Sequence, residues 1–234
     1  MIKIEKSDVY GWEAAIRGMR NPMNSWDKSD SYNYYEKILD LKAQCLELEE
    51  DIRVRDCEWV IGENDLRLMQ NLSSAGNDHG KFLRMICVTA DITAPLYWWK
   101  EYDTYKIGTV ANSCSTMHKL THKKFELADF SHEHLDGFSV IQLKGLIEYL
   151  NKCRENYLGD YGKINGQKGM WWQMIQLLPS SYNQKRTVLL NYQVLKSMYF
   201  ARKDHKLDEW HDFCDWCEGL PYFKEICILT KEGA

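Results

Sequence analysis

The stretch from Tyr97 to Leu120, YWWKEYDTYKIGTVANSCSTMHKL, concentrates side chains that can contact a ligand. Thr104, Tyr105 and Ser115 supply hydroxyl groups that donate and accept hydrogen bonds, and Lys100 supplies a cation. Because Lys100 and Thr104 lie four residues apart, we expect them to share one face of a helix. The pattern predicts the wall of a ligand site. The alternative is a helix of the hydrophobic core, since four aromatic residues follow the same helical spacing: Tyr97, Trp98, Trp99 and Tyr102.

Histidines and cysteines form two further patterns that could carry chemistry. His118 and His122 stand at positions i and i+4, a spacing that can hold a metal ion, and a second group follows in SHEH, residues 131–134. The glutamate of an H-E-x-x-H motif is absent, which favours solvated or capping histidines, so we predict no metal site. Cys214 and Cys217 form a single C-x-x-C on an expected helix. Without the four ligands of a zinc site, this pair is interpreted as structural.

Composition bounds the class of protein. The 234 residues are 44% hydrophobic and 13% aromatic, enough to bury a substantial core. A formal net charge of −4 gives no general attraction to nucleic acid or anionic lipid, so any anion site must be local. The sequence contains no signal-peptide pattern and no apolar segment of membrane-spanning length, so we expect a cytoplasmic protein with no membrane or nucleic-acid partner. No repeat or linker interrupts the chain, which predicts a single domain over residues 1–234.

Hydrophobic periodicity predicts a helix-dominated α+β chain. Two segments rich in β-branched and aromatic residues are expected to be strands, 57–62 and 81–92. Apolar residues at helical spacing predict helices over 7–20, with Ser7 or Asp8 as N-cap, and over 31–50, 138–156, 167–179, 186–203 and 207–221.

The segment LPSSYNQKRTVLLNYQVLKSMYFAR, residues 178–202, resembles the flavin-dependent thymidylate synthase (ThyX) family. The family pattern there runs L-P, then N-x-R-x-L, then an arginine that ends the same helix. It is matched without a gap by Leu178, Pro179, Asn191, Leu195 and Arg202. The resemblance extends over residues 66–220. It implies a ThyX-like fold, helix-dominated with a small antiparallel sheet, and a homotetramer.

The family's flavin motif, R-H-R-x-x-S followed by S-x-R, is expected in the stretch that starts at Tyr97. The basic triplet falls on residues 100–102, Lys-Glu-Tyr, while Tyr105 stands at the first serine and Ser115 is the nearest match to the second. Gln193 and Ile175 replace two further arginines of the family. Guanidinium groups clamp phosphate bidentately, which these side chains cannot do, so FAD is expected to bind weakly or to be lost.

The resemblance implies roles for seven residues. The expected nucleotide-binding residues are Arg202, Ser115 and Lys100, and the expected cofactor-binding residues are His79, Asn191, Gln193 and Tyr105. The implied function is that of a divergent flavin-dependent thymidylate synthase homologue acting on a pyrimidine deoxynucleotide such as dUMP, with folate dependence open. One alternative is a phage-type protein that binds or sequesters a nucleotide without turnover, and another is a purely structural oligomer. Arg202 itself has the alternative role of a salt-bridged residue at a helix end.

Overall fold

The computed structural model describes residues 2–44, 58–159 and 167–229. Its centre is a four-stranded antiparallel sheet in the order β1-β4-β6-β5, formed by β1 (Lys3–Tyr10), β4 (Cys87–Pro95), β6 (Asn183–Asn191) and β5 (Val110–Ser113). Nine residue pairs join β4 to β6, from Cys87 opposite Asn191 to Pro95 opposite Asn183. A two-stranded ribbon joins β2 (Tyr32–Asn33) to β3 (Trp59–Val60).

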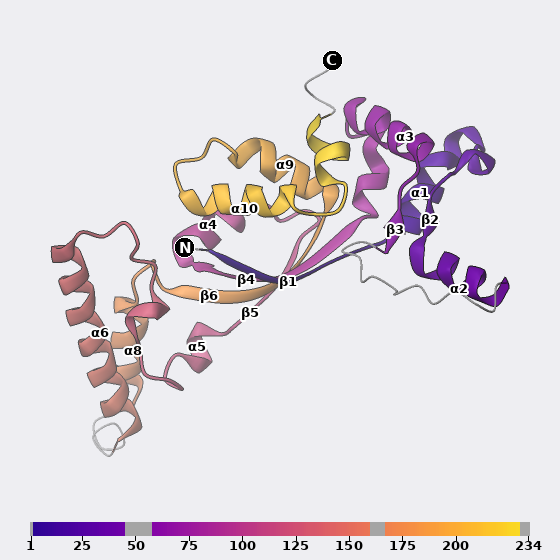
Figure 1. The fold of residues 1–234 in the computed structure, drawn as a ribbon. Coiled ribbons are helices and arrows are strands. Elements are labelled where there is room, and N and C mark those ends of the chain that lie inside the picture. The colour runs from indigo at the N-terminus through magenta and orange to yellow at the C-terminus, as the bar shows by residue number, and fades with distance from the viewer. Residues whose placement is uncertain (1, 45–57, 160–166, 230–234) are drawn as a thin grey trace.

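Helices make up most of the remaining described structure and cover one face of the sheet. Figure 1 shows α4, α9 and α10 over that face, α6 beside α8 at one end of the molecule, and α1 to α3 at the other. The helices are α1 (Trp12–Arg20), α2 (Tyr34–Gln44), α3 (Glu63–Ser74), α4 (Leu96–Tyr102), α5 (Thr116–Lys119), α6 (Gly137–Leu158), α8 (Gln167–Leu177), α9 (Tyr192–Arg202) and α10 (Asp208–Glu218). The predicted helix-dominated α+β class with a small antiparallel sheet is confirmed. None of the described helices is long and apolar enough to span a membrane.

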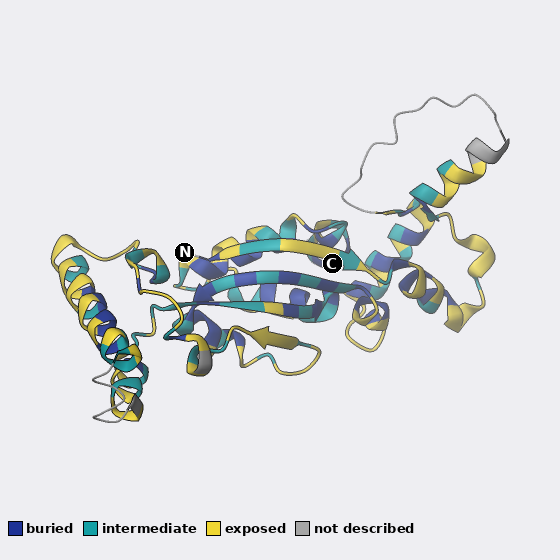
Figure 2. Cartoon of the chain, turned by 90° about the horizontal axis from the view of Figure 1, so that it is seen from below, coloured by how far each residue is buried: buried dark blue, intermediate teal, exposed yellow. Residues whose placement is uncertain are grey.

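Alternation along β4 fixes which face of the sheet is covered. Val88, Ala90 and Ile92 are buried, whereas Thr89 and Asp91 between them are only half-buried. Successive side chains of a strand point to opposite faces, so one set packs under the helices. Figure 2 shows the opposite side, with the strands in front of the helices and β5 exposed along its length.

The described residues form two hydrophobic clusters. The larger lies between the sheet and its helices, and its largest fully buried side chains include Trp12, Trp98, Trp99 and Trp210. The smaller is shared by α6, α8 and the segment before α6, and includes Phe125, Phe130, Leu150 and Met174. The expectation of one domain over the whole chain stays a prediction.

The expected helix over 7–20 proves to be a strand followed by a helix. Residues 3–10 pair with β4, so neither Ser7 nor Asp8 is the N-cap, and α1 begins only at Trp12. The change of direction occurs at Gly11, whose φ of 93° favours glycine. A Cβ at that position would lie 2.1 Å from the carbonyl oxygen of Met85. The apolar residues of α1 are buried as its helical spacing predicts, among them Ala15 and Ile16, whereas Val9 lies in β1 and is half-buried.

Other boundaries also differ from expectation. Residues 32–33 of the expected helix over 31–50 form β2, and the helix begins at Tyr34. In the expected strand over 81–92, residues 80–84 form a 3₁₀ helix and the strand begins at Cys87. In the expected helix over 186–203, residues up to Asn191 belong to β6 and the helix begins at Tyr192. Short apolar runs fit both periodicities, and pairing with a neighbouring strand decides between them. The predicted ends of the 31–50 helix and the 57–62 strand lie partly outside the described residues.

Candidate functional site

The Tyr105 pocket, a cavity of about 430 Å³, lies where the loop after α4 meets the junction of β6 and α9. Three of the expected cofactor-binding residues line it: Tyr105, Asn191 and Gln193. The other polar side chains in its lining are Asn77, Arg84, Thr104, Lys106 and Ser197, and Ile107 and Val194 add apolar surface. This volume lies within the roughly 300–1,000 Å³ range of small-molecule pockets.

The loop over 104–108 is held against α9 by local geometry. Thr104 Oγ1 donates a hydrogen bond of 2.7 Å to the carbonyl of Glu101, which turns the chain away from the end of α4. Gly108 has a φ of 77°, and a Cβ there would lie 3.0 Å from Asn191 Nδ2. Close approach to Asn191 therefore requires glycine at this position. Asn191 is itself fixed, because its Oδ1 accepts a 3.0 Å hydrogen bond from Val194 N and caps α9.

The lining of the Tyr105 pocket is positively charged. Arg84 and Lys106 are both exposed, and neither forms an ion pair with any residue that the structure describes. Among the described residues that line it, none is Asp or Glu. Gln193 Nε2 donates to Asn77 Oδ1 at 3.1 Å, which orients the two amides across the pocket. Two uncompensated cations beside amide groups suit an anionic ligand that also forms hydrogen bonds.

Arg202 lies behind the wall of this pocket rather than in it. Its Nε donates to the Tyr105 hydroxyl at 2.8 Å, and its Nη1 pairs with Glu101 Oε2 at 3.1 Å. The guanidinium carbon also lies 4.8 Å from the centre of the Trp210 ring. The side chain is 14% exposed. Within the described chain, Arg202 thus acts as the salt-bridged residue that the sequence left open, and it braces Tyr105.

The triplet over 100–102 does not form a phosphate clamp. Lys100 is exposed and lies outside the pocket lining, and Glu101 is paired with Arg202. Tyr102 is buried, its hydroxyl has no hydrogen-bond partner among the described residues, and burial raises its pKa. Because α4 ends at Tyr102, the expectation that Lys100 and Thr104 share a helix face is wrong. These residues do not fit the diphosphate of a flavin, and the core interpretation holds for the buried Trp98 and Trp99.

Ser115 and His79 lie elsewhere. Ser115 lines a second cavity of about 510 Å³, the β5–α5 pocket, which lies between the end of β5 and the start of β6. His79 is exposed and lines neither cavity, although it neighbours Asn77. The sequence-based interpretation missed Arg84 and Lys106. Lys106 stands within the opening stretch, but Arg84 comes from the segment expected to be a strand, so no local pattern pointed to it.

The structure separates the two histidines of the i, i+4 pair and buries the two cysteines of the C-x-x-C pattern. No group of three or more His, Cys, Asp or Glu residues within the described ranges is placed to hold a metal ion. Helix α5 ends at Lys119, so His122 lies beyond it and the i, i+4 pair does not share one helix. Cys214 and Cys217 are buried in α10, and burial raises the pKa of Cys214 to about 11 and also raises that of Cys217 well above its ordinary value. Protonated, buried thiols are unreactive.

The fold is that of the ThyX thymidylate synthases. The chain is similar to Thymidylate Synthase X from Helicobacter pylori with FAD and dUMP, with a TM-score of 0.62 and 15% identity over 98% of this chain and 99% of that one. It is also similar to a flavin-dependent thymidylate synthase ThyX from Helicobacter pylori complexed with FAD and dUMP, with a TM-score of 0.60 and 16% identity over 97% and 98% of the two chains. No family model and no curated protein sequence matches it. The ThyX-like fold expected from the sequence is confirmed.

Proposed function

We propose that this chain is a ThyX-like protein that binds a pyrimidine deoxynucleotide in the Tyr105 pocket. The observation that carries the proposal is the pair of uncompensated cations, Arg84 and Lys106, in a cavity whose lining has no carboxylate. The solved structures of the same fold contain dUMP and FAD, which supports a ligand of this class. The whole chain carries a net negative charge, so an anionic ligand is attracted to this pocket and not to the protein surface in general.

The phosphate and the pyrimidine of the nucleotide each have matching groups in the pocket. The phosphate binds Arg84 and Lys106, because charge-assisted hydrogen bonds to phosphate are the strongest contacts available there. The pyrimidine has both amide and carbonyl groups on its edge, and the side-chain amides of Asn77 and Gln193 can donate to and accept from such an edge. Tyr105 forms a wall of the site in an orientation fixed by Arg202.

Two activities are compatible with this binding site. The first is methyl transfer to the nucleotide, for which a bound flavin would supply hydride chemistry. The second is binding or sequestration without turnover, which is favoured by the Arg202–Glu101 ion pair and by the triplet over 100–102 that does not fit a flavin diphosphate. We propose nucleotide binding as the property common to both, with flavin-dependent thymidylate synthesis as the activity to test first.

Calorimetric titration with dUMP tests the binding site. Lys106→Ala and Arg84→Ala are each expected to raise the dissociation constant about tenfold or more, because each removes a charge-assisted contact. Lys152→Ala, on the exposed surface of α6, is the matched control and should leave the affinity unchanged. Equal affinity in all four proteins would refute the placement of the nucleotide in this pocket.

The same preparations separate the two activities. The purified protein is expected to contain little FAD, as measured by its absorption spectrum, since the residues of α4 do not clamp a diphosphate. Formation of methylated nucleotide from dUMP with added FAD, a reductant and a one-carbon folate donor would establish the enzyme. Tight dUMP binding with no product under those conditions would establish the non-catalytic alternative.

A further inference from the structure

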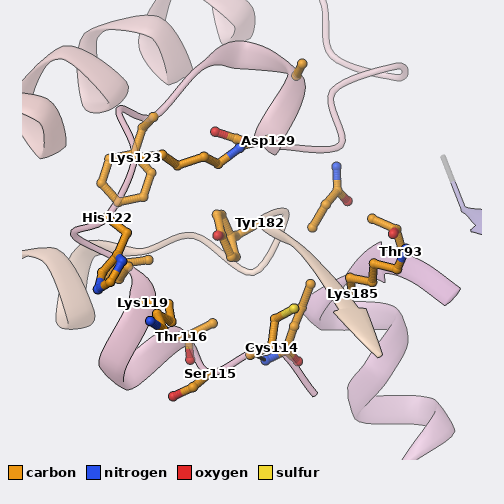
Figure 3. Close-up of a pocket in the computed structure, with 15 residues that line it drawn as sticks. Thr93, Cys114, Ser115, Thr116, Lys119, His122, Lys123, Asp129, Tyr182 and Lys185 are labelled. Atoms are coloured by element: carbon orange, nitrogen blue, oxygen red, sulfur yellow. Dashed lines mark hydrogen bonds and ion pairs between the residues drawn. The ribbon is translucent and has the colours of Figure 1, made fainter. Parts of the chain in front are cut away.

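The β5–α5 pocket is the larger of the two cavities and differs from the Tyr105 pocket in construction. At about 510 Å³ it lies within the size range of small-molecule sites. Its side chains come from segments far apart in the sequence. Figure 3 shows Cys114, Ser115, Thr116 and Lys119 along one side and His122 and Lys123 beyond them, with Tyr182 near the centre and Lys185 of β6 next to Cys114.

The charges around this pocket are unequal. Among the described residues that line it, three are lysines and one, Asp129, carries a carboxylate. Lys123 is paired with Asp129, and Lys185 lies 3.1 Å from Asp91, so these two cations are partly compensated. Lys119 is exposed and pairs with no carboxylate in the parts of the chain that the structure describes. His122, also exposed, adds two ring nitrogens that can form hydrogen bonds.

An apolar surface completes the cavity. Leu120 and Phe125 are buried members of the smaller hydrophobic cluster, and the half-buried Tyr182 packs edge-on against Phe125 with ring centres 6.4 Å apart. Binding pockets of small molecules typically combine such an apolar floor with a few charged groups at the rim. An inorganic ion would leave the half-buried ring of Tyr182 uncovered, whereas a planar ligand ring would cover it.

We propose that the β5–α5 pocket binds a small planar organic anion, whose phosphate or carboxylate contacts Lys119 and whose ring lies over Tyr182. This site is separate from the proposed nucleotide site, because the two cavities share no lining residue. The inference does not depend on the proposed function. Substitution of Lys119 tests ligand binding at the β5–α5 pocket, whereas substitution of Arg84 or Lys106 tests binding at the Tyr105 pocket.

Cys114 reports on the pocket, because its free thiol is exposed within the lining. In the reporter reaction the Cys114 thiolate displaces iodide from iodoacetate or from neutral iodoacetamide, and mass spectrometry of the Cys114 peptide gives both rates. Iodoacetate is an anion and is attracted by a cationic pocket, whereas iodoacetamide is neutral. At low salt, the ratio of the iodoacetate rate to the iodoacetamide rate at Cys114 is therefore expected to be severalfold higher than the same ratio for the thiol of glutathione. Lys119→Glu should reduce the ratio about tenfold, and Lys106→Ala, in the other pocket, should leave it unchanged.

Protection of Cys114 identifies the ligand class. Phenyl phosphate at millimolar concentration is expected to slow iodoacetamide labelling of Cys114 in the full chain but not in the Lys119→Glu variant, and phenol should have no effect. A glutathione-like ratio that Lys119→Glu does not change, or labelling that phenyl phosphate does not slow, would overturn the proposal. If dUMP protects Cys114, the anion site is supported, while the placement of the nucleotide in the Tyr105 pocket is contradicted.

Discussion

Arg202 matches the arginine position of the family in sequence, and in the structure its side chain contacts other residues of the same chain. Its guanidinium contacts the carboxylate of Glu101, the hydroxyl of Tyr105 and the ring of Trp210. Glu101 lies 101 residues away in the sequence, so no local pattern pairs the two. The contacts give Arg202 the role of holding Tyr105 in the wall of the pocket. The expectation that Arg202 binds the nucleotide directly stays a prediction.

Replacement of Arg202 by alanine is expected to lower the free energy of unfolding by about 1–2 kcal/mol, because it removes a hydrogen bond, an ion pair and ring packing together. Glu101→Gln should cost under about 1 kcal/mol, since a partly exposed ion pair contributes little. Urea denaturation measures both. Unchanged stability of Arg202→Ala together with lost dUMP affinity would instead make Arg202 the anion anchor.

At the scale of the elements, Asp65 joins α3 to α1 and to the loop over 29–31. It is fully buried and accepts hydrogen bonds from Arg20 at 2.6 Å, from the hydroxyls of Ser29 and Ser31 and from two backbone amides. Burial alone would raise its pKa, but the hydrogen bonds from Ser31, Ser29 and Arg20 outweigh burial and hold the pKa below its ordinary value. The carboxylate form is therefore the one that the fold stabilises.

The pKa of Asp65 is lower in the folded state than in the unfolded chain. Its contribution to the free energy of unfolding is therefore complete above the unfolded pKa, about 3.9, and is lost as the pH falls through the folded pKa. Asp65→Asn is expected to cost about 3–5 kcal/mol at pH 7, because Arg20 is left as an unpaired buried charge. The variant should also have a flatter pH dependence below pH 4. Urea midpoints against pH test both effects, with the exposed Asp40→Asn as control. Identical acid profiles for the variant and the original chain would contradict the assignment.

Asn191 is the last residue of β6 and the N-cap of α9. Its side chain caps the helix, so Asn191→Ala is expected to lower the free energy of unfolding by about 1 kcal/mol, whereas Asn191→Ser should keep most of the stability because a hydroxyl also caps. Thermal denaturation measures the difference. A serine variant as unstable as the alanine variant would show that the amide contributes through its contact with the loop over 104–108 instead.

At the scale of the whole molecule, we expect the homotetramer that the sequence suggested. Apolar side chains remain exposed along α6 and α8, including Phe138, Ile141 and Trp172. Such side chains are enriched where subunits meet. Light scattering should give four times the chain mass, and Phe138→Glu with Ile141→Glu should shift it to a smaller species, whereas Lys152→Glu should not. A monomer across a wide concentration range would contradict this expectation.

The sequence by itself determined the class of fold and much of the helical core. Periodicity placed the apolar residues of α1, α6, α8 and α10, because side chains of a helix meet its neighbours at a spacing that is local in the chain. The pattern over 178–202 pointed to the ThyX-like fold that the structure confirms. Three of the seven expected site residues meet in one cavity, since Asn191 and Gln193 adjoin the same helix start.

Tertiary structure decided where the strands begin and end, and which charged side chains meet at the site. Residues 3–10 and 183–191 became strands because both pair with β4, and hydrogen bonds between segments so distant in sequence leave little local signal. The same distance in sequence hid Glu101 as the partner of Arg202, and folding places Arg84 and Lys106 in the lining of one cavity. Local periodicity reports which side of an element is buried. Which charges meet depends on how the elements pack, and only the folded chain fixes that.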